Sequence, residues 1–143
     1  MTDARAVRYE IEIPGVLQAM GAVHEAIDAQ GLDRRLRHLV LLRASQINRC
    51  AHCVKMHTRE ARADGESSER LDRVIVFEQS SEFSAEEKAA LAWAEALTVV
   101  DARTDYAALR ARLRAHFSER EIGALTANIA MINLWNRLHL SRY

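Results

Sequence analysis

The chain has a single proline, Pro14, and five glycines among its 143 residues. Ala, Leu, Arg and Glu are abundant, and these residues lose little rotamer freedom in a helix. Because residues that interrupt helices are so scarce, the sequence predicts an all-α fold. A chain of this length buries enough surface for one hydrophobic core and is too short for two ordinary domains. We therefore expect residues 1–143 to form a single-domain bundle of about six or seven helices.

Capping residues predict where these helices begin and end. Pro14 suits a first helical turn, and Gly31 ends the helix that follows it. Two capping boxes, "SAEE" at 84–87 and "SERE" at 118–121, each pair a serine with a glutamate and start two further helices. The other expected boundaries are a start at Asp33, an end near Asn48, an end at Gly65, a start at Ser67 or Ser68, and a start at Thr104 or Asp105.

The amino-terminal residues show a different pattern. Residues 7–13, "VRYEIEI", alternate apolar and polar side chains as a strand does, but no second strand candidate offers a partner. We therefore expect residues 1–13 to form an extended N-terminal arm. In the helix that follows, apolar residues recur at helical spacing up to Gly31, namely Val16, Leu17, Met20, Val23 and Ile27.

Charge and hydropathy narrow the range of partners. Twenty Lys and Arg balance twenty Asp and Glu, so the formal net charge of zero gives no overall attraction to nucleic acid or to an anionic membrane. No apolar run approaches the roughly 18 residues of a membrane span, and the amino terminus lacks the apolar core of a signal peptide. We expect a cytoplasmic protein without nucleic-acid or membrane partners. In that reducing compartment, a lone cysteine pair favours redox chemistry or metal binding over a permanent structural disulfide.

Both cysteines lie in the stretch "SQINRCAHCVKMHTREA" at 45–61. A helix advances by about 100° per residue, so Cys50, Cys53 and His57 project from one face. His52 points nearly the opposite way. Cys50 falls at or near the first turn, where free amides and the helix dipole stabilise a thiolate. A helical C-x-x-C pair placed there, with an imidazole beside it, is suited both to ionise and to close a short disulfide.

Two other interpretations of these residues are open. In a non-catalytic zinc-binding helical module, three ligands would be Cys50, Cys53 and His57, and His38 would be the fourth. Structural zinc sites usually take ligands from two separated segments, however, and the sequence has no second C-x-x-C or H-x-x-H pair. Alternatively, both cysteines are inert core residues, since cysteine is among the most buried residue types.

The segment "LRHLVLLRASQINRCAHCVKMHTREARADGES" resembles the core motif of the AhpD-like (alkylhydroperoxidase-D-like) branch of the carboxymuconolactone decarboxylase superfamily. That pattern is a glutamate followed, after eleven residues, by C-x-H/aromatic-C-x-x-x-H. Residues 33–66 match it closely, and "EEKAALAWAEALT" at 86–98 and "INLWNRLHL" at 132–140 also resemble this branch. The resemblance implies an all-helical AhpD-like fold and homo-oligomers, commonly trimers or hexamers.

The resemblance also implies a reaction and a role for each residue of the motif. It implies a thiol-dependent peroxidase or disulfide oxidoreductase that reduces hydroperoxides without a metal or other cofactor, recycled by a protein or small-thiol reductant. Cys53 would attack the O–O bond and become a sulfenic acid, and Cys50 would resolve it to a disulfide. His57 would accept or relay the thiol proton, with His52 in a supporting role. Lactone decarboxylation, which names the superfamily, is the alternative activity, but members that catalyse it generally lack the cysteine pair.

The sequence departs from the family pattern at one position. His38 stands where the family has its relay glutamate, and no carboxylate occurs between Asp33 and Glu60. Three explanations are open. His38 shuttles the proton itself, Glu60 orients the His57 imidazole from the same helical face, or the dithiol serves another exchange reaction with weak peroxidase activity. Our hypothesis is that His38 lines the site.

The remaining aromatic and histidine residues show no such pattern. Trp93 and Trp135 fit a core or a subunit interface better than a ligand site. The other histidines have no comparable constellation, so we expect them at the surface or in an interface: His24, His116 and His139.

Overall fold

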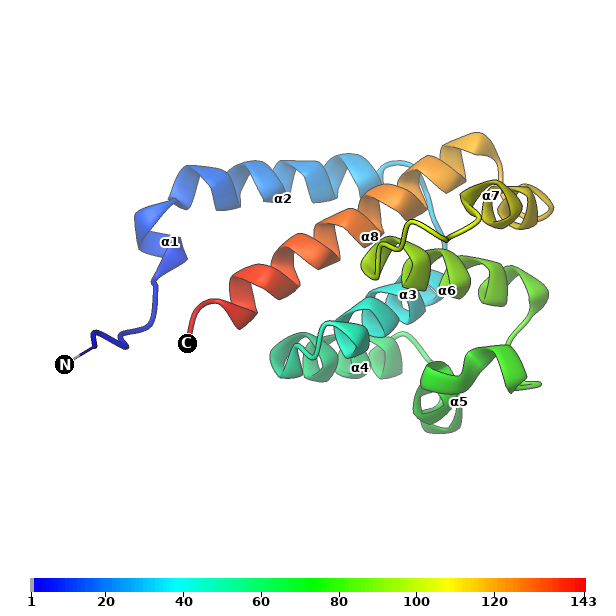
Figure 1. Ribbon diagram of the computed structural model, residues 1–143, viewed down its shortest axis with the longest axis horizontal. Coiled ribbons are helices and arrows are strands. Elements are labelled where there is room, and N and C mark those ends of the chain that lie inside the picture. The colour runs from blue at the N-terminus through cyan, green and yellow to red at the C-terminus, as the bar shows by residue number, and fades with distance from the viewer. Residues whose placement is uncertain (1) are drawn as a thin grey trace.

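The structure is a computed structural model that describes residues 2–143, and these residues form eight α-helices and one 3₁₀ helix, η1, with no strand (Figure 1). In chain order they are α1 (Tyr9–Glu12), α2 (Pro14–Asp28), α3 (Arg34–Ile47), α4 (Ala51–Ala63), α5 (Ser68–Arg73), η1 (Val74–Gln79), α6 (Ala85–Thr98), α7 (Tyr106–Arg114) and α8 (Glu119–Leu140). The all-α prediction is confirmed, and the number of helices slightly exceeds the expectation because α1 was not predicted. Of the predicted arm, residues 2–8 lie outside any helix, and Met1 lies outside the described residues.

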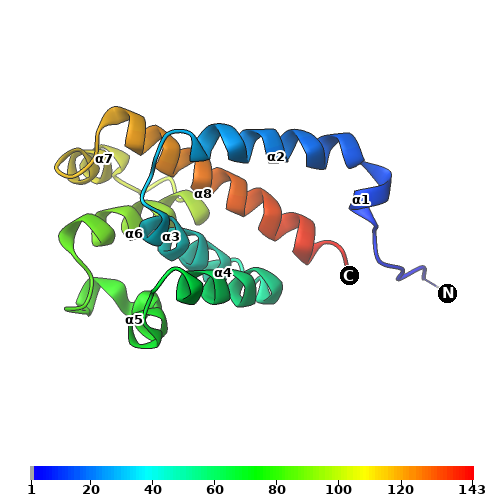
Figure 2. The same cartoon turned by 180° about the vertical axis from the view of Figure 1, so that it is seen from behind.

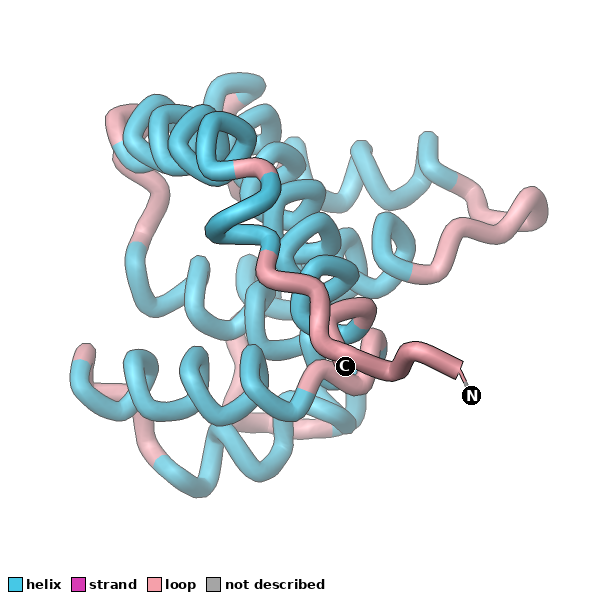
Figure 3. The backbone as a smooth tube through the Cα atoms, turned by 90° about the vertical axis from the view of Figure 1, so that its left-hand side faces the viewer, coloured by secondary structure: helices cyan, strands magenta, loops and turns pink. Residues whose placement is uncertain are grey.

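The prediction of an extended arm is wrong for residues 9–12, which form the single turn of α1. Without a neighbouring strand, an extended segment leaves its amide and carbonyl groups unpaired, whereas a helical turn pairs them locally. In this turn the Ile13 amide donates to the Tyr9 carbonyl at 2.9 Å. The arm is also anchored at the other end of the chain, because the Val7 amide donates to the Arg142 carbonyl at 3.0 Å. The arm therefore lies beside the carboxyl-terminal end of the chain (Figure 3).

Helix α3 is the central helix of the bundle. It packs against α4, α6 and α8, and Figure 2 shows it among them. Contact on several sides accounts for its apolar run, in which Leu39 and Val40 are fully buried. The helices around it contribute further fully buried side chains, among them Leu91, Ala94, Leu125 and Ile129. Helix α3 therefore provides a well-packed base for the cysteine segment that follows it.

Local capping explains where the helices begin. Both predicted capping boxes are present: Ser84 pairs with Glu87 at the start of α6, and Ser118 pairs with Glu121 at the start of α8. Three further helices begin at predicted caps whose side-chain oxygen accepts a backbone amide, namely Asp33, Ser67 and Asp105. The predicted helix starts are confirmed at all of these positions.

Helix α2 runs along α8 at the edge of the bundle (Figures 1 and 2). Met20 and Ile27 are buried, but Val16 and Val23 are 51% and 43% exposed. The two valines stay exposed because α8 covers only one side of α2.

The longest helix is α8, with 22 residues. Neither α8 nor any other helix in the described part of the chain combines the length and the hydropathy needed to cross a membrane. Polar side chains interrupt the apolar surface of α8, and two of them, Asn128 and Asn136, are buried within the bundle.

Candidate active site

The candidate site begins at a disulfide between Cys50 and Cys53, at the start of α4. Cys50 is the N-cap residue of that helix, and its sulfur accepts the Cys53 amide at 3.4 Å. The two Cα atoms are 5.3 Å apart, and both residues are buried. Both sulfurs therefore lie at the positive end of the α4 dipole, where a reduced cysteine is stabilised as the thiolate.

The turn that leads into the disulfide is held by amide side chains of α8. Arg49 adopts the left-handed conformation, with φ of 57°, which is uncommon for a residue with a Cβ atom. The neighbouring Asn48 donates from Nδ2 to the side-chain oxygens of Asn133 and Asn136, both at 2.9 Å. Asn136 is fully buried and also donates to the Ser45 hydroxyl at 3.1 Å. Helix α8 thus positions the turn that carries the first cysteine.

We expect Asn136→Ala to lower the free energy of unfolding by about 2–4 kcal/mol, because it removes hydrogen-bond partners of Asn48 and Ser45 and leaves a cavity. Urea unfolding followed by circular dichroism measures this change. Asn128→Ala is the matched control, since Asn128 is also buried but its Nδ2 has no hydrogen-bond partner among the described residues. An equal loss of stability in the two variants would show that the Asn136 hydrogen bonds contribute little.

His57 follows Cys53 by one turn of α4 and is buried. Burial lowers the pKa of His57 to about 4, and the positive charge of Arg37 adds to this shift. The Glu60 carboxylate, 3.6 Å from Nδ1 of His57, acts in the opposite direction. The imidazole is therefore neutral at neutral pH and has a lone pair with which to accept a proton.

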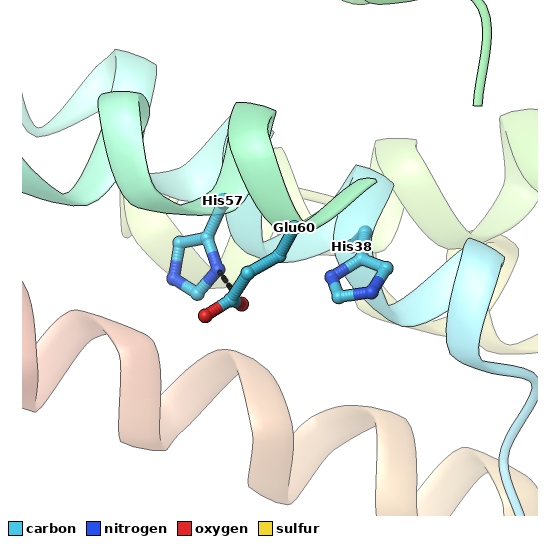
Figure 4. A group of neighbouring side chains, drawn as sticks. All are labelled: His38, His57 and Glu60. Atoms are coloured by element: carbon cyan, nitrogen blue, oxygen red, sulfur yellow. Dashed lines mark ion pairs between the residues drawn. The ribbon is translucent and has the colours of Figure 1, made fainter. Parts of the chain in front are cut away.

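His38 projects from α3 toward the same point as His57 and Glu60 (Figure 4). It is buried, and its Nε2 lies 2.5 Å from Oδ2 of Asp64. This contact lowers the pKa of the Asp64 carboxyl below its ordinary value. Potential ligand atoms of His38, His57 and Glu60 lie within 4.8 Å of one another. The fold thus brings an imidazole of α3 together with an imidazole and a carboxylate of α4.

His52 lies outside this group. It is exposed, and its ring stacks on that of His139 with a centroid distance of 4.3 Å. Its ring is therefore engaged with α8 rather than with the buried side chains of α4.

A cavity of about 320 Å³ lies beside Cys53 and His57. Its wall includes Cys53, His57 and Glu60, whereas Cys50 does not line it. Much of the remaining wall is apolar or aromatic, from Leu41, Met56, Ile132 and Trp135. This cavity, called the apolar cavity below, has room for a small organic molecule beside Cys53.

A second cavity of about 610 Å³, called the polar cavity below, lies beside His38 and Asp64. Arg37 and Glu60 line both cavities and so stand between them. The Arg37 guanidinium pairs with Asp28, with 2.6 Å between Nη1 and Oδ1. The group of His38, His57 and Glu60 therefore lies between two cavities. Cys53 lines the apolar cavity, and Asp64 lines the polar cavity.

Several residues of these cavities were not predicted from the sequence. Trp135, expected in a core or interface, lines the apolar cavity and donates from Nε1 to Nε2 of His24 at 2.7 Å. His139, expected at the surface or in an interface, also lines it. Asp64, the partner of His38, follows it by 26 residues. No spacing in the sequence signals these residues, because only the packing of separate helices brings them to the site.

The ligand set of the zinc alternative is not assembled as predicted. Within residues 2–143, the group of side chains suited to a metal ion consists of His38, His57 and Glu60, and neither cysteine belongs to it. The two sulfurs are instead bonded to each other, so the cysteines are not the two unconnected core thiols of the other alternative. The disulfide and the histidine–carboxylate group are therefore distinct parts of the site.

Comparison with known sequences finds clear relatives. The model of the "Carboxymuconolactone decarboxylase family" matches residues 14–96. YdfG of Bacillus subtilis, an uncharacterised protein, is 33% identical over 137 residues, which cover 96% of this chain and 92% of YdfG. YnjA of Escherichia coli, also uncharacterised, is 39% identical over 108 residues, which cover 76% of this chain and 59% of YnjA.

Solved structures share the fold. Atu0492 from Agrobacterium tumefaciens superposes with a TM-score of 0.88 at 36% identity, covering 96% of this chain and 94% of that protein. Atu0492 has no known function and has been suggested to be the antioxidant defence protein AhpD. The debrominase Bmp8 superposes with a TM-score of 0.80 at 23% identity, covering 90% of this chain and 69% of Bmp8. At that identity the likeness to Bmp8 shows the fold alone.

Proposed function

This chain belongs to the AhpD-like branch of the carboxymuconolactone decarboxylase family, and on that premise we propose that it is a thiol-dependent peroxidase or disulfide oxidoreductase acting on hydroperoxides. The observation that supports this most directly is the disulfide between Cys50 and Cys53, next to a cavity that also holds His57. A disulfide that closes so short a loop adds little to stability, because little chain entropy is removed from the unfolded state. Reversible oxidation is the better explanation for the pair.

In the proposed reaction, the reduced Cys53 thiolate attacks an oxygen of the hydroperoxide. The S–O bond forms as the O–O bond breaks, and the alkoxide takes up a proton and leaves as an alcohol. The Cys50 thiol then attacks the sulfenic sulfur of Cys53, and water leaves as the disulfide closes. The two thiols supply the two electrons that reduce the hydroperoxide. A protein or small-thiol reductant returns two electrons and two protons and reopens the disulfide.

Cys53 is assigned as the attacking residue because it lines the apolar cavity and Cys50 does not. His57 lines the same cavity, and in the proposed mechanism it accepts the thiol proton and returns it to the alkoxide. The thiolate that forms beside His57 stabilises the protonated imidazole, which offsets the effect of burial on its pKa.

Glu60, His38 and Asp64 complete the proposed proton relay. The Glu60 carboxylate faces Nδ1 of His57 and orients the ring, so it supplies the carboxylate that the family motif has at the position of His38. His38, held by Asp64, borders the polar cavity and exchanges protons with solvent there.

The apolar cavity favours an organic hydroperoxide with an alkyl or aryl group. Its apolar and aromatic wall gains free energy by covering such a group, and hydrogen peroxide offers no apolar surface. Its volume of about 320 Å³ is at the lower end of the range for small-molecule sites, so we expect a compact substrate.

We also propose that the chain forms a homo-oligomer. The arm and helices α1, α2 and α8 leave apolar side chains 40% exposed or more, namely Val7, Ile11, Val16, Val23, Leu134 and Leu140. Apolar side chains gathered on neighbouring elements are typical of surfaces that associate. A trimer or hexamer is the expectation from the family resemblance, and native mass spectrometry determines the number of subunits.

The test of the proposed function is a thiol count on the reduced protein before and after one equivalent of cumene hydroperoxide. We expect both thiols to disappear, the intact mass of the denatured protein to show no added oxygen, and one equivalent of alcohol to form. Thiols that stay reduced while the hydroperoxide persists would contradict the proposal. Oxygen retained on a cysteine without closure of the disulfide would contradict the role of Cys50.

A further inference from the structure

We propose that His38, His57 and Glu60 form a binding site for a divalent transition-metal ion, with Zn²⁺ as the probe. The ligands are Nδ1 of His38, Nδ1 of His57 and the Glu60 carboxylate, so this site differs from the cysteine-based zinc alternative. Figure 4 shows the three side chains pointing into one space, one from α3 and two from α4. The family resemblance implies no metal, and the proposal rests on these residues alone.

The two imidazoles have nitrogens available for a metal. Nδ1 of His38 and both ring nitrogens of His57 are buried and have no hydrogen-bond partner among residues 2–143. Nε2 of His38 contacts Oδ2 of Asp64 at 2.5 Å, so a neutral His38 carries its proton on Nε2 and presents Nδ1 as a lone pair. A carboxylate behind a histidine is the usual partner of a metal-binding imidazole, because it fixes the tautomer and makes the ring more basic.

The separations between the ligands suit a metal ion after a small adjustment. Zinc binds nitrogen and carboxylate oxygen at about 2.0–2.2 Å, which places two ligands of a tetrahedral site about 3.4 Å apart. The present separations are within 4.8 Å. The side chains of His38 and His57 are 8% and 7% exposed, whereas that of Glu60 is 45% exposed and has room to rotate. Glu60 is therefore the ligand with the most freedom to adjust, and three protein ligands leave a fourth position for water.

The local charges permit a cation despite two nearby arginines. Arg37 pairs with Asp28 at 2.6 Å, and Arg34 pairs with Asp64 at 3.2 Å. Each guanidinium is thus paired with a carboxylate, although Asp64 also contacts His38, and the negative charge of Glu60 is left to face the ion. The polar cavity, which Asp28, Asp64 and Glu60 line, provides the route from solvent.

One consequence of this site rests on the proposed function. A metal ion on Nδ1 of His57 confines the ring proton to Nε2, so the ring can no longer accept the proton of Cys53. We therefore expect Zn²⁺ to slow hydroperoxide reduction, and a chelator to restore it.

The experiment is a calorimetric titration of Zn²⁺ into the oxidised protein, in which the disulfide keeps both sulfurs from binding. We expect one Zn²⁺ per chain in the wild type. His38→Gln removes a ligand, and Asp64→Asn removes only the carboxylate behind it, so Kd should rise by at least about 10-fold in each. His116→Gln alters an exposed histidine outside the group and should leave Kd unchanged.

Oxidised wild type that binds no Zn²⁺, or that binds it with the same Kd as His38→Gln and Asp64→Asn, would overturn the metal site. A Co²⁺ absorption spectrum of the oxidised wild type is a second test, and it does not depend on whether the variants fold. Bands of a nitrogen- and oxygen-bound ion would support the site, and a spectrum that stays that of hexaaqua Co²⁺ would overturn it. If Zn²⁺ binds as expected but does not slow hydroperoxide reduction, the metal site stands and the proposed role of His57 is wrong.

Discussion

Cys53→Ser is expected to abolish hydroperoxide reduction, with a loss of at least about 10³-fold in the single-turnover rate. A serine hydroxyl stays protonated near neutral pH, whereas the Cys53 thiolate is the form that attacks the O–O bond. Cys53 lines the apolar cavity, and Cys50 sits at the N-cap of α4 outside that wall. Cys50→Ser should therefore still form one equivalent of alcohol and a sulfenic acid on Cys53, without closing a disulfide.

Rapid-quench measurement of alcohol release, with a chemical trap for sulfenic acid, distinguishes these outcomes. The two variants remove the same disulfide, so each is the stability control for the other. Equal single-turnover rates in the wild type and in Cys53→Ser would show that Cys53 is not the attacking residue. If Cys50→Ser lost alcohol release while Cys53→Ser kept it, Cys50 would be the attacking residue and Cys53 the resolving one.

His57→Gln is expected to lower the single-turnover rate by about 10²–10⁴-fold at neutral pH, the usual contribution of a positioned acid–base group. Glutamine has a similar reach but cannot accept a proton. The loss should shrink at alkaline pH, where the Cys53 thiol ionises without assistance. His52→Gln changes an exposed histidine on the same helix and should retain most of the rate. Equal losses in the two variants, or a loss that does not depend on pH, would contradict proton transfer by His57.

The pH dependence of stability is an independent readout of the same residue. In the metal-free oxidised protein, the pKa of His57 is about 4, below its ordinary value of 6.5. Between these values the unfolded chain binds the proton more readily than the folded protein does. The contribution of His57 is therefore fully present above pH 6.5 and is lost as the pH falls to about 4. For this shift the loss is about 3 kcal/mol, and His57→Gln should remove it. Parallel curves of unfolding free energy against pH for the two proteins would show that His57 titrates normally.

Short-range patterns were enough to predict much of the architecture. Asp33, Ser84 and Ser118 each accept an amide three residues ahead, so these helix starts depend on residues within one turn. The placement of Cys50 at the start of a helix, with Cys53 one turn further along it, follows from the same short stretch.

The alternating pattern of residues 7–13 was misleading for a physical reason. A strand pairs its backbone with a neighbouring chain segment, so the alternation of side chains alone does not determine one. Residues 9–12 turn into a helix because that conformation pairs their backbone groups locally. The partial exposure of apolar residues on α2 has a similar cause. The spacing of these residues along the helix does not reveal how many other helices will cover them.

The sequence by itself determined most of the helix starts and the place of two cysteines at one of them, whereas the tertiary structure alone decided which residues complete the site. His38 meets Asp64 across 26 residues, and Trp135 meets His24 across 111 residues. The pKa of His57 likewise depends on the helices that bury it. Hydrogen bonds within a turn join residues at fixed short spacing, so they can be recognised in a sequence. Contacts between helices depend on crossing angles and on which faces are covered, which no short pattern encodes.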